Sequence, residues 1–174
     1  MPYNLGKVSV LVVEDIHPML TLLVSTLGII GIKNIAKARD GKEGFSNFQK
    51  VNPDIVITDW HMHPVDGIEM TKQIRMNAMS VNRRVPIVMM TGYSAMQRVE
   101  KARDAGVTEF LVKPFTADIL AKRITTIIEK PRQFVHTNNF FGPDRRRRKD
   151  KNYKGPYRRV EDEEKLEKKG IYKV

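Results

Sequence analysis

The sequence predicts an α/β fold in which helices cover both faces of a five-stranded parallel sheet. Five short predicted strands, of which Ile55-Val56-Ile57-Thr58 is rich in β-branched residues, alternate with segments whose apolar residues recur at helical spacing. The apolar run that ends at Asp59 is continuous rather than alternating, which indicates a strand that is buried on both faces, as in a parallel sheet. This alternation is typical of a doubly wound sheet whose strands all end at one edge.

The five predicted strands are spaced so that each pair leaves room for a helix between them. They are expected at residues 8–13, 34–38, 55–59, 85–90 and 109–112.

Five helices are expected between and after these strands. The first begins near Pro18, which suits a first helical turn, and the second has Asp40 as its N-cap. The third follows Gly67, the fourth covers residues 94–104, and the last ends before Pro131.

The length of 174 residues suggests one domain, 1–130, followed by a basic, flexible extension, 131–174. There is no cysteine, which excludes disulfides and thiolate metal sites and fits a reducing compartment. The start of the chain lacks the form of a secretory signal, and no apolar run approaches about 18 residues. We therefore expect a cytoplasmic protein with no membrane segment.

Polar side chains stand at the carboxyl ends of four predicted strands: Glu14 and Asp15, then Asp59, Thr91 and Lys113. Ligands of open α/β sheets bind at this edge. Three carboxylates repel one another unless a cation joins them, and oxygen ligands suit Mg²⁺ that shares a phosphate. An ionised Asp can attack a phosphoryl group, while a lysine and a hydroxyl stabilise the phosphoryl oxygens.

Other phosphate-handling and metal-binding classes fit less well. Haloacid-dehalogenase-type phosphatases need a second Asp two residues after the first, where this sequence has His61. No P-loop motif and no dinucleotide-binding glycine motif is present. His61 and His63 alone do not define a transition-metal site, because no third ligand is evident.

Residues from about 7 to 130 resemble the receiver domain of two-component response regulators, in particular single-domain, chemotaxis-regulator-like members. The resemblance rests on Glu14-Asp15, Asp59, Asp66-Gly67, Thr91 and Lys113-Pro114-Phe115, which follow the family's order. It implies a flavodoxin-like sheet with strand order 2-1-3-4-5. His63 stands where the family usually has proline, with Pro64 one place later.

The resemblance also implies roles for individual residues. Asp59 would be the phosphoacceptor, aided by Lys113 and Thr91, and a cis peptide bond would join Lys113 to Pro114. Thr91 and Phe110 would form the switch pair. Mg²⁺ would be held by Asp15, Asp59, the backbone carbonyl of His61 and, through water, Glu14.

A receiver of this kind accepts a phosphoryl group from a sensor histidine kinase or a phosphotransfer protein and then contacts a downstream protein target. It catalyses only its own phosphotransfer and autodephosphorylation and is not otherwise an enzyme. Two alternatives remain open: a phosphate sink or relay intermediate, and a receiver-shaped binding module that is not phosphorylated.

The extension carries most of the net charge of +11: residues 131–174 hold 14 Lys/Arg and 7 Asp/Glu, whereas residues 1–130 hold 17 and 13. Its apolar pattern is inadequate for a helix-turn-helix core. Three interpretations remain: a solvated disordered tail, a docking segment for an acidic protein, or a nucleic-acid-binding segment. The basic cluster behind them is Arg145, Arg146, Arg147 and Arg148, with Phe140, Phe141, Tyr153 and Tyr157 as possible ordering residues.

Overall fold

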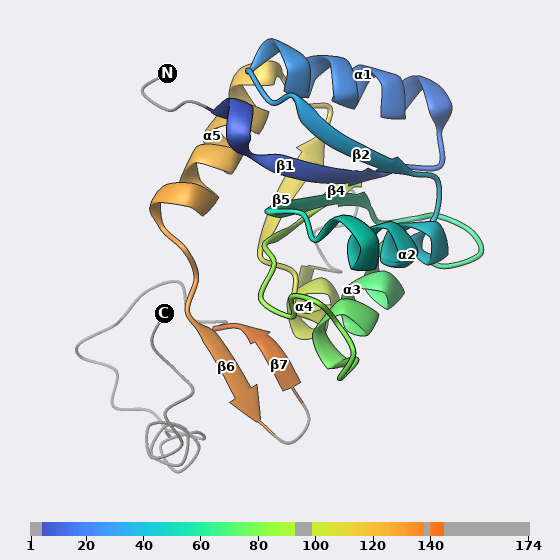
Figure 1. Cartoon of the computed structure of the whole chain (residues 1–174), viewed down its shortest axis with the longest axis vertical. Coiled ribbons are helices and arrows are strands. Elements are labelled where there is room, and N and C mark those ends of the chain that lie inside the picture. Colours follow the sequence, from blue (N-terminus) through green and yellow to red (C-terminus); the bar gives the residue numbers. More distant parts are fainter. Residues whose placement is uncertain (1–4, 93–98, 138–139, 145–174) are drawn as a thin grey trace.

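The computed structural model of the chain describes residues 5–92, 99–137 and 140–144. One parallel sheet has the strand order β2-β1-β3-β4-β5, which confirms the predicted fold class (Figure 1). Its strands are β1 (Ser9–Val13), β2 (Asn34–Ala38), β3 (Ile55–Asp59), β4 (Ile87–Gly92) and β5 (Glu109–Lys113).

In the described part of the chain, five α-helices follow these strands in turn, after a short 3₁₀ turn at Leu5–Lys7. They are α1 (His17–Ile29), α2 (Gly41–Val51), α3 (Gly67–Met76), α4 (Val99–Ala105) and α5 (Ala117–Glu129). Part of the helix predicted over 94–104 lies outside the described residues. Among the residues that the structure does describe, no helix is both long enough and apolar enough to cross a membrane.

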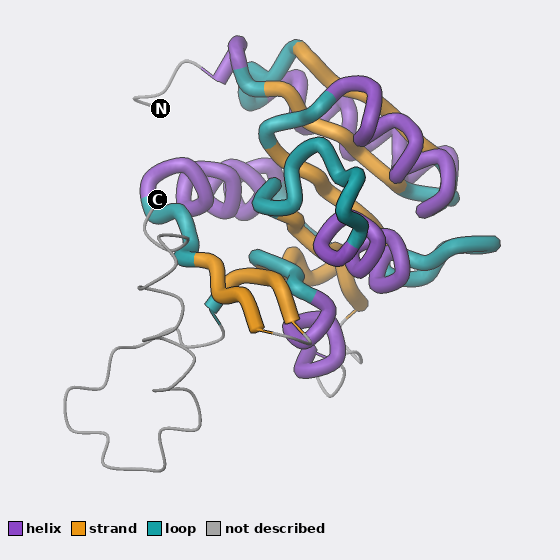
Figure 2. Tube along the Cα trace, turned by 60° about the horizontal axis from the view of Figure 1, so that its bottom comes forward, coloured by secondary structure: helices purple, strands orange, loops and turns teal. Residues whose placement is uncertain are grey.

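The inner strands β1, β3 and β4 are buried on both faces, as their continuous apolar runs predict. Val10 and Val12 of β1 pack in a cluster with α1 and α5, whereas Leu11 and Val13 pack with α2 and α3. Successive strand residues point to opposite faces, so a strand without alternation must be covered twice. Figure 2 shows the sheet enclosed between these helices.

Strand β4 lies two residues later than predicted. The sequence suggests a strand over 85–90, but β4 begins at Ile87. Proline has no backbone N–H, so Pro86 can contribute only its carbonyl, which accepts from the Val56 amide at 2.9 Å. Consequently Thr91 and Gly92 are part of the strand rather than residues that follow it.

A hairpin that is not among the elements predicted from the sequence follows α5. Strands β6 (Phe134–Thr137) and β7 (Phe140–Pro143) pair antiparallel, separate from the main sheet, and β7 lies beside α3 and α4 (Figures 1 and 2). Phe140 and Phe141 are buried, with 7% and 8% of their surface exposed. The structure thus differs from the expected flexible extension over residues 134–143, while residues 145–174 lie outside the described part.

Candidate functional site

Asp59 is the last residue of β3, a central strand with β1 on one side and β4 on the other. Only 8% of its surface is exposed. The backbone amide of His61, in the loop that follows, donates to Asp59 Oδ2 at 3.3 Å. The sheet therefore presents the Asp59 carboxylate at its carboxyl edge, as the sequence predicts for a ligand site.

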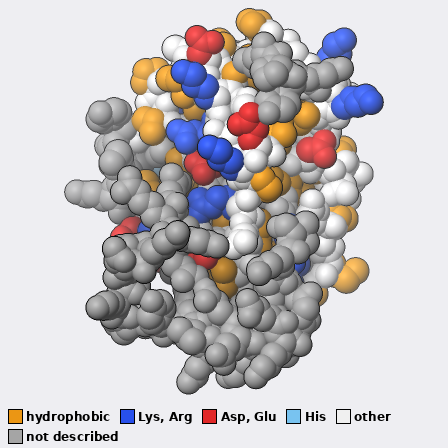
Figure 3. Space-filling view, turned by 90° about the vertical axis from the view of Figure 1, so that its left-hand side faces the viewer, with side chains coloured by type: hydrophobic (Ala, Val, Ile, Leu, Met, Phe, Trp, Pro, Cys, Tyr) orange, Lys and Arg blue, Asp and Glu red, His pale blue; other side chains and the backbone are white. Residues whose placement is uncertain are grey.

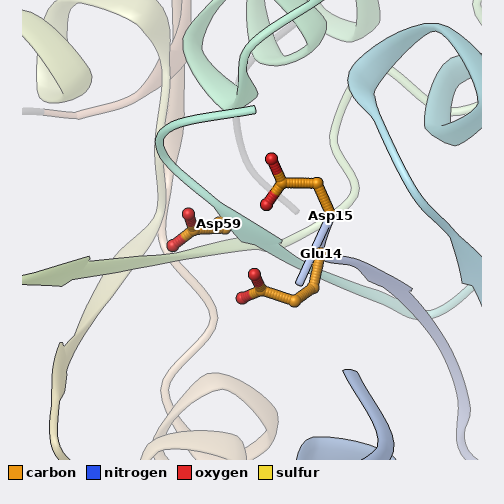
Figure 4. Close-up of side chains that lie close together, drawn as sticks. All are labelled: Glu14, Asp15 and Asp59. Carbon is orange, nitrogen blue, oxygen red and sulfur yellow. The ribbon is translucent and has the colours of Figure 1, made fainter. Parts of the chain in front are cut away.

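Two further carboxylates converge on Asp59 from the end of β1. Glu14 has no exposed surface, while Asp15 beside it is exposed. One oxygen from each of the three residues lies within 4.8 Å of the others. Figure 4 shows the Glu14 and Asp15 carboxyl groups turned toward Asp59. Three clustered oxygen donors, one of them open to solvent, fit a hard cation such as Mg²⁺ that keeps some of its waters.

Lys113, the last residue of β5, joins two of these acids. Its Nζ lies 2.7 Å from Asp59 Oδ1 and 2.9 Å from Glu14 Oε2. Burial by itself would lower the pKa of Lys113, but the hydrogen bonds and negative charges of Asp59 and Glu14 outweigh burial and raise that pKa. The raised pKa keeps the Lys113 ammonium charged at neutral pH.

The charged form of Glu14, unlike that of Lys113, is destabilised in the folded protein. Burial raises the pKa of Glu14 above its usual 4.5, and the nearby Asp59 charge raises it further, although Lys113 opposes both effects. Among the described residues of the site, three carboxylates thus face one lysine, which favours the binding of a cation.

The start of α3 packs closely against the backbone of Asp59 and Trp60. The Gly67 amide donates to the Trp60 carbonyl at 3.0 Å, and a Cβ on Gly67 would stand only 2.1 Å from the Asp59 carbonyl oxygen. Asp66 caps the helix by accepting from the Glu69 amide at 2.7 Å. The Asp66-Gly67 pair therefore has a physical reason: the acid starts the helix, and only glycine permits this close approach.

Thr91 and Phe110 lie on adjacent strands. Thr91 is buried, and its hydroxyl donates to the Gly92 carbonyl at 3.2 Å rather than to an acid of the site. Phe110 is half-buried and packs on a cluster formed by β4, α3, α4 and the residues after β3 and α4. The members of this cluster are Trp60, Ile68, Met89, Ala102, Ala105 and Val107.

Two X-Pro peptide bonds near the site are cis. One joins Lys113 to Pro114, where the resemblance implies it. The other joins His63 to Pro64, in the loop after Asp59, where the sequence departs from the usual family pattern. Arg145, Arg146, Arg147 and Arg148 lie outside the described residues.

Sequence reasoning did not find the buried charges at the opposite end of the sheet. Arg75 of α3 is only 1% exposed, and Glu109 at the start of β5 is 7% exposed. Glu109 forms ion pairs with Arg123 at 3.2 Å and with Arg132 at 3.6 Å. The hairpin that lies near these charges did have a signal in the sequence. The aromatic and β-branched run from Phe134 to Thr137, followed by Asn-Asn and two phenylalanines, is typical of a hairpin.

Comparison with known proteins agrees with this geometry. Residues 10–125 match the response regulator receiver domain family. The chain is 32% identical over 124 residues to chemotaxis protein CheY-3 of Vibrio cholerae, covering 71% of this chain and 94% of that protein. It is 31% identical over 121 residues to chemotaxis protein CheY of Pseudomonas aeruginosa, covering 70% and 96% respectively.

Solved structures show the same fold. The chemotaxis response regulator CheY4 of Vibrio cholerae superposes with a TM-score of 0.63 at 29% identity, covering 69% of this chain and 98% of that one. A response regulator receiver domain protein from Clostridium thermocellum gives a TM-score of 0.63 at 26% identity, covering 71% and 95%. The chain therefore belongs to the response regulator receiver domain family and is a two-component response regulator related to the CheY chemotaxis proteins.

Proposed function

We propose that this protein is a phosphorylation-dependent switch in which Asp59 accepts a phosphoryl group from a phosphohistidine donor. The observation that carries the proposal is the convergence of Glu14, Asp15 and Asp59 within 4.8 Å, with the Lys113 ammonium 2.7 Å from Asp59. No single member of this set is informative, but together they supply a nucleophile, ligands for a cation, and a positive charge for the phosphoryl oxygens.

The transfer forms one bond and breaks another. An Asp59 carboxylate oxygen attacks phosphorus as the phosphorus–nitrogen bond of phosphohistidine breaks, and the departing imidazole takes a proton from solvent. Lys113 stays protonated and stabilises the charge on the phosphoryl oxygens. Asp15, Asp59, the His61 carbonyl and, through water, Glu14 would hold Mg²⁺, which when bound neutralises further charge on these oxygens.

The switch follows from the new charge. A phosphoryl group adds roughly −1.5 to −2 charges and three acceptor oxygens beside Thr91. The Thr91 hydroxyl then exchanges its bond to the Gly92 carbonyl for a bond to a phosphoryl oxygen. Its movement lets Phe110 turn inward on the cluster shared with α4, which repacks the surface around α4 and β5.

The partners follow from this chemistry. The donor is a sensor histidine kinase or a phosphotransfer protein, and the output is a changed contact with a downstream protein target. The kinship with proteins named for chemotaxis supports an output through protein contact.

The test is phosphorylation by acetyl phosphate with Mg²⁺, followed by separation of phosphorylated from unphosphorylated protein. The wild-type protein is expected to gain one phosphoryl group, and Asp59→Asn to gain none. The matched control is Asp118→Asn, the same change at an exposed residue of the first turn of α5, which is expected to behave as wild type. Full labelling of Asp59→Asn would refute the assignment.

A further inference from the structure

The hairpin formed by β6 and β7 rests on the turn that leads into β5. Strand β7 lies beside α3 and α4 (Figure 1). A Cβ on Gly142 of β7 would stand 3.0 Å from the Gly106 Cα, in the turn between α4 and β5. A Cβ on Gly106 would stand 2.9 Å from Arg75 Cγ. The turn is therefore enclosed between α3 and the hairpin, with no room for a side chain on either glycine.

Arg75 and Arg83 fasten the hairpin to the domain. The Arg75 guanidinium donates to the Gly106 carbonyl at 3.0 Å and to the Arg83 carbonyl at 2.7 Å, and Phe134 of β6 covers it at 5.1 Å. Arg83 stacks on Phe141 of β7 at 4.2 Å. Burial, with the Arg83 charge, lowers the pKa of Arg75 to about 9, so it remains a cation at neutral pH. Aromatic faces and backbone carbonyls thus hold two cations where the hairpin contacts the domain. We call this contact, of Phe134, Phe141 and Gly142 with Arg75, Arg83 and Gly106, the hairpin seat.

The same turn carries part of the cluster on which Phe110 packs. Ala105 and Val107 stand on either side of Gly106, and both belong to the cluster that contains Trp60 and Met89. Phe110 follows Glu109 at the start of β5, and Glu109 is paired with Arg132 of the segment leading to the hairpin. Any repacking of Phe110 therefore acts on the turn that the hairpin encloses.

We infer that the hairpin is a regulatory clasp: its seat on the α4–β5 turn favours the unphosphorylated arrangement of the switch, and phosphorylation loosens the seat. In the described structure the Thr91 hydroxyl donates to the Gly92 carbonyl and the hairpin packs on the turn, so the unphosphorylated arrangement of Thr91 and the packed hairpin occur together. Because a close-packed contact resists displacement, moving Ala105 and Val107 weakens the seat, and by reciprocity an intact seat opposes the switch. This inference rests on the proposed function, since it takes Asp59 as the phosphoacceptor.

The first test uses the unmodified full-length protein. Amide hydrogen exchange is measured with Mg²⁺ alone and with Mg²⁺ plus beryllofluoride, a phosphoryl mimic. Amides of residues 134–137 and 140–142 are expected to exchange at least about fivefold faster with the mimic, the lower end of usual coupling. Unchanged hairpin exchange while the mimic is bound would overturn the clasp.

The second test measures the reverse coupling through Trp60, the single tryptophan, which is adjacent to Asp59 and packs in the Phe110 cluster. Its fluorescence is followed as beryllofluoride is titrated with Mg²⁺. Gly142→Ala and the double variant Phe134→Ala/Phe141→Ala are expected to bind the mimic at least about fivefold more tightly than wild type. Gly28→Ala is the matched control, because a Cβ there meets nothing within 4 Å, and its midpoint is expected to equal that of wild type.

The outcomes separate the two proposals. Wild-type midpoints in both hairpin variants, or weaker binding, would overturn the clasp while leaving phosphorylation of Asp59 intact. Absence of any response to the mimic in the wild-type protein would overturn the proposed function, and the clasp with it.

Discussion

Glu14 has no exposed surface, yet its carboxyl group lies beside Asp59 and shares the Lys113 ammonium with it. Burial raises the pKa of Glu14, so the folded protein binds this proton more tightly than the unfolded chain does. The sign follows directly: the ionised Glu14 lowers stability as the pH rises above about 4.5. A group that weakens the fold at neutral pH is expected where charge serves binding rather than folding.

Glu14→Gln is therefore expected to raise stability at pH 7. The amide removes the buried charge and its repulsion with Asp59, and the gain should be about 1 kcal/mol in the free energy of unfolding, within the usual range for such a change. The gain should shrink as the pH falls through about 4.5, because Glu14 then becomes protonated in the unfolded chain as well as in the folded protein. Urea denaturation at several pH values measures it. Glu69→Gln, at an exposed position, should stay within about 0.5 kcal/mol of wild type, and a loss of stability in Glu14→Gln at pH 7 would contradict the argument.

Lys113→Met is expected to have the opposite effect. Removing the ammonium leaves Glu14 and Asp59 uncompensated, which should cost about 2 kcal/mol at pH 7, less than a fully buried pair because the lysine side chain is 20% exposed. Since the pKa of Lys113 is raised above 10.5, the wild-type interaction persists through neutral pH and is lost only in the alkaline range. Thermal unfolding with and without Mg²⁺ provides the measurement. Mg²⁺ should stabilise the variant more than wild type, and an equal Mg²⁺ effect in both would contradict the shared-charge interpretation.

At the scale of elements, the position of α3 depends on Gly67. A methyl group there would stand 2.1 Å from the Asp59 carbonyl oxygen, so the start of α3 or the end of β3 must move. Gly67→Ala is expected to cost about 1–3 kcal/mol of unfolding free energy, as overpacking does. Gly28→Ala, in the open surface of α1, is expected to stabilise by up to about 1 kcal/mol, because alanine favours the helix. Urea denaturation of both variants decides the matter, and equal stability would show that α3 adjusts freely.

The strands and the site could be predicted from the sequence because their signals are local. Each of Asp59, Thr91 and Lys113 lies at the end of an apolar run, and a parallel sheet brings such ends together whatever the details of packing. The hairpin has a local signal of its own in the run from Phe134 to Thr137, but its contacts with the domain could not be predicted in the same way. Phe134 and Phe141 stack on Arg75 and Arg83, which lie about sixty residues earlier in the chain. Nothing near Arg75 in the sequence indicates that a guanidinium will be buried, since this depends on the hairpin that covers it.

At the scale of the molecule, Glu109 connects three parts of the chain. It opens β5 and pairs with Arg123 of α5 and with Arg132 of the segment that leads to the hairpin. Lys and Arg side chains gather together with acidic ones on the face that Figure 3 shows. Although the chain has a high net positive charge, the ion pairs of Glu109 with Arg123 and Arg132 are specific contacts at the place where the extension leaves the domain.

Glu109→Gln therefore tests whether the extension is part of the folded unit. The change leaves the shape intact but leaves the Arg123 and Arg132 guanidinium groups facing a neutral amide, with Glu109 itself only 7% exposed. We expect a loss of about 1–3 kcal/mol in unfolding free energy, the usual cost of leaving a buried charged group without its hydrogen-bond partner. Glu100→Gln is the matched control, since its ion pair with Arg103, at 3.8 Å and well exposed, should contribute less than about 1 kcal/mol. Hydrogen exchange should show faster exchange at residues 134–137 in Glu109→Gln and not in Glu100→Gln. Equal exchange in the two variants would mean that the hairpin is held by its aromatic seat alone.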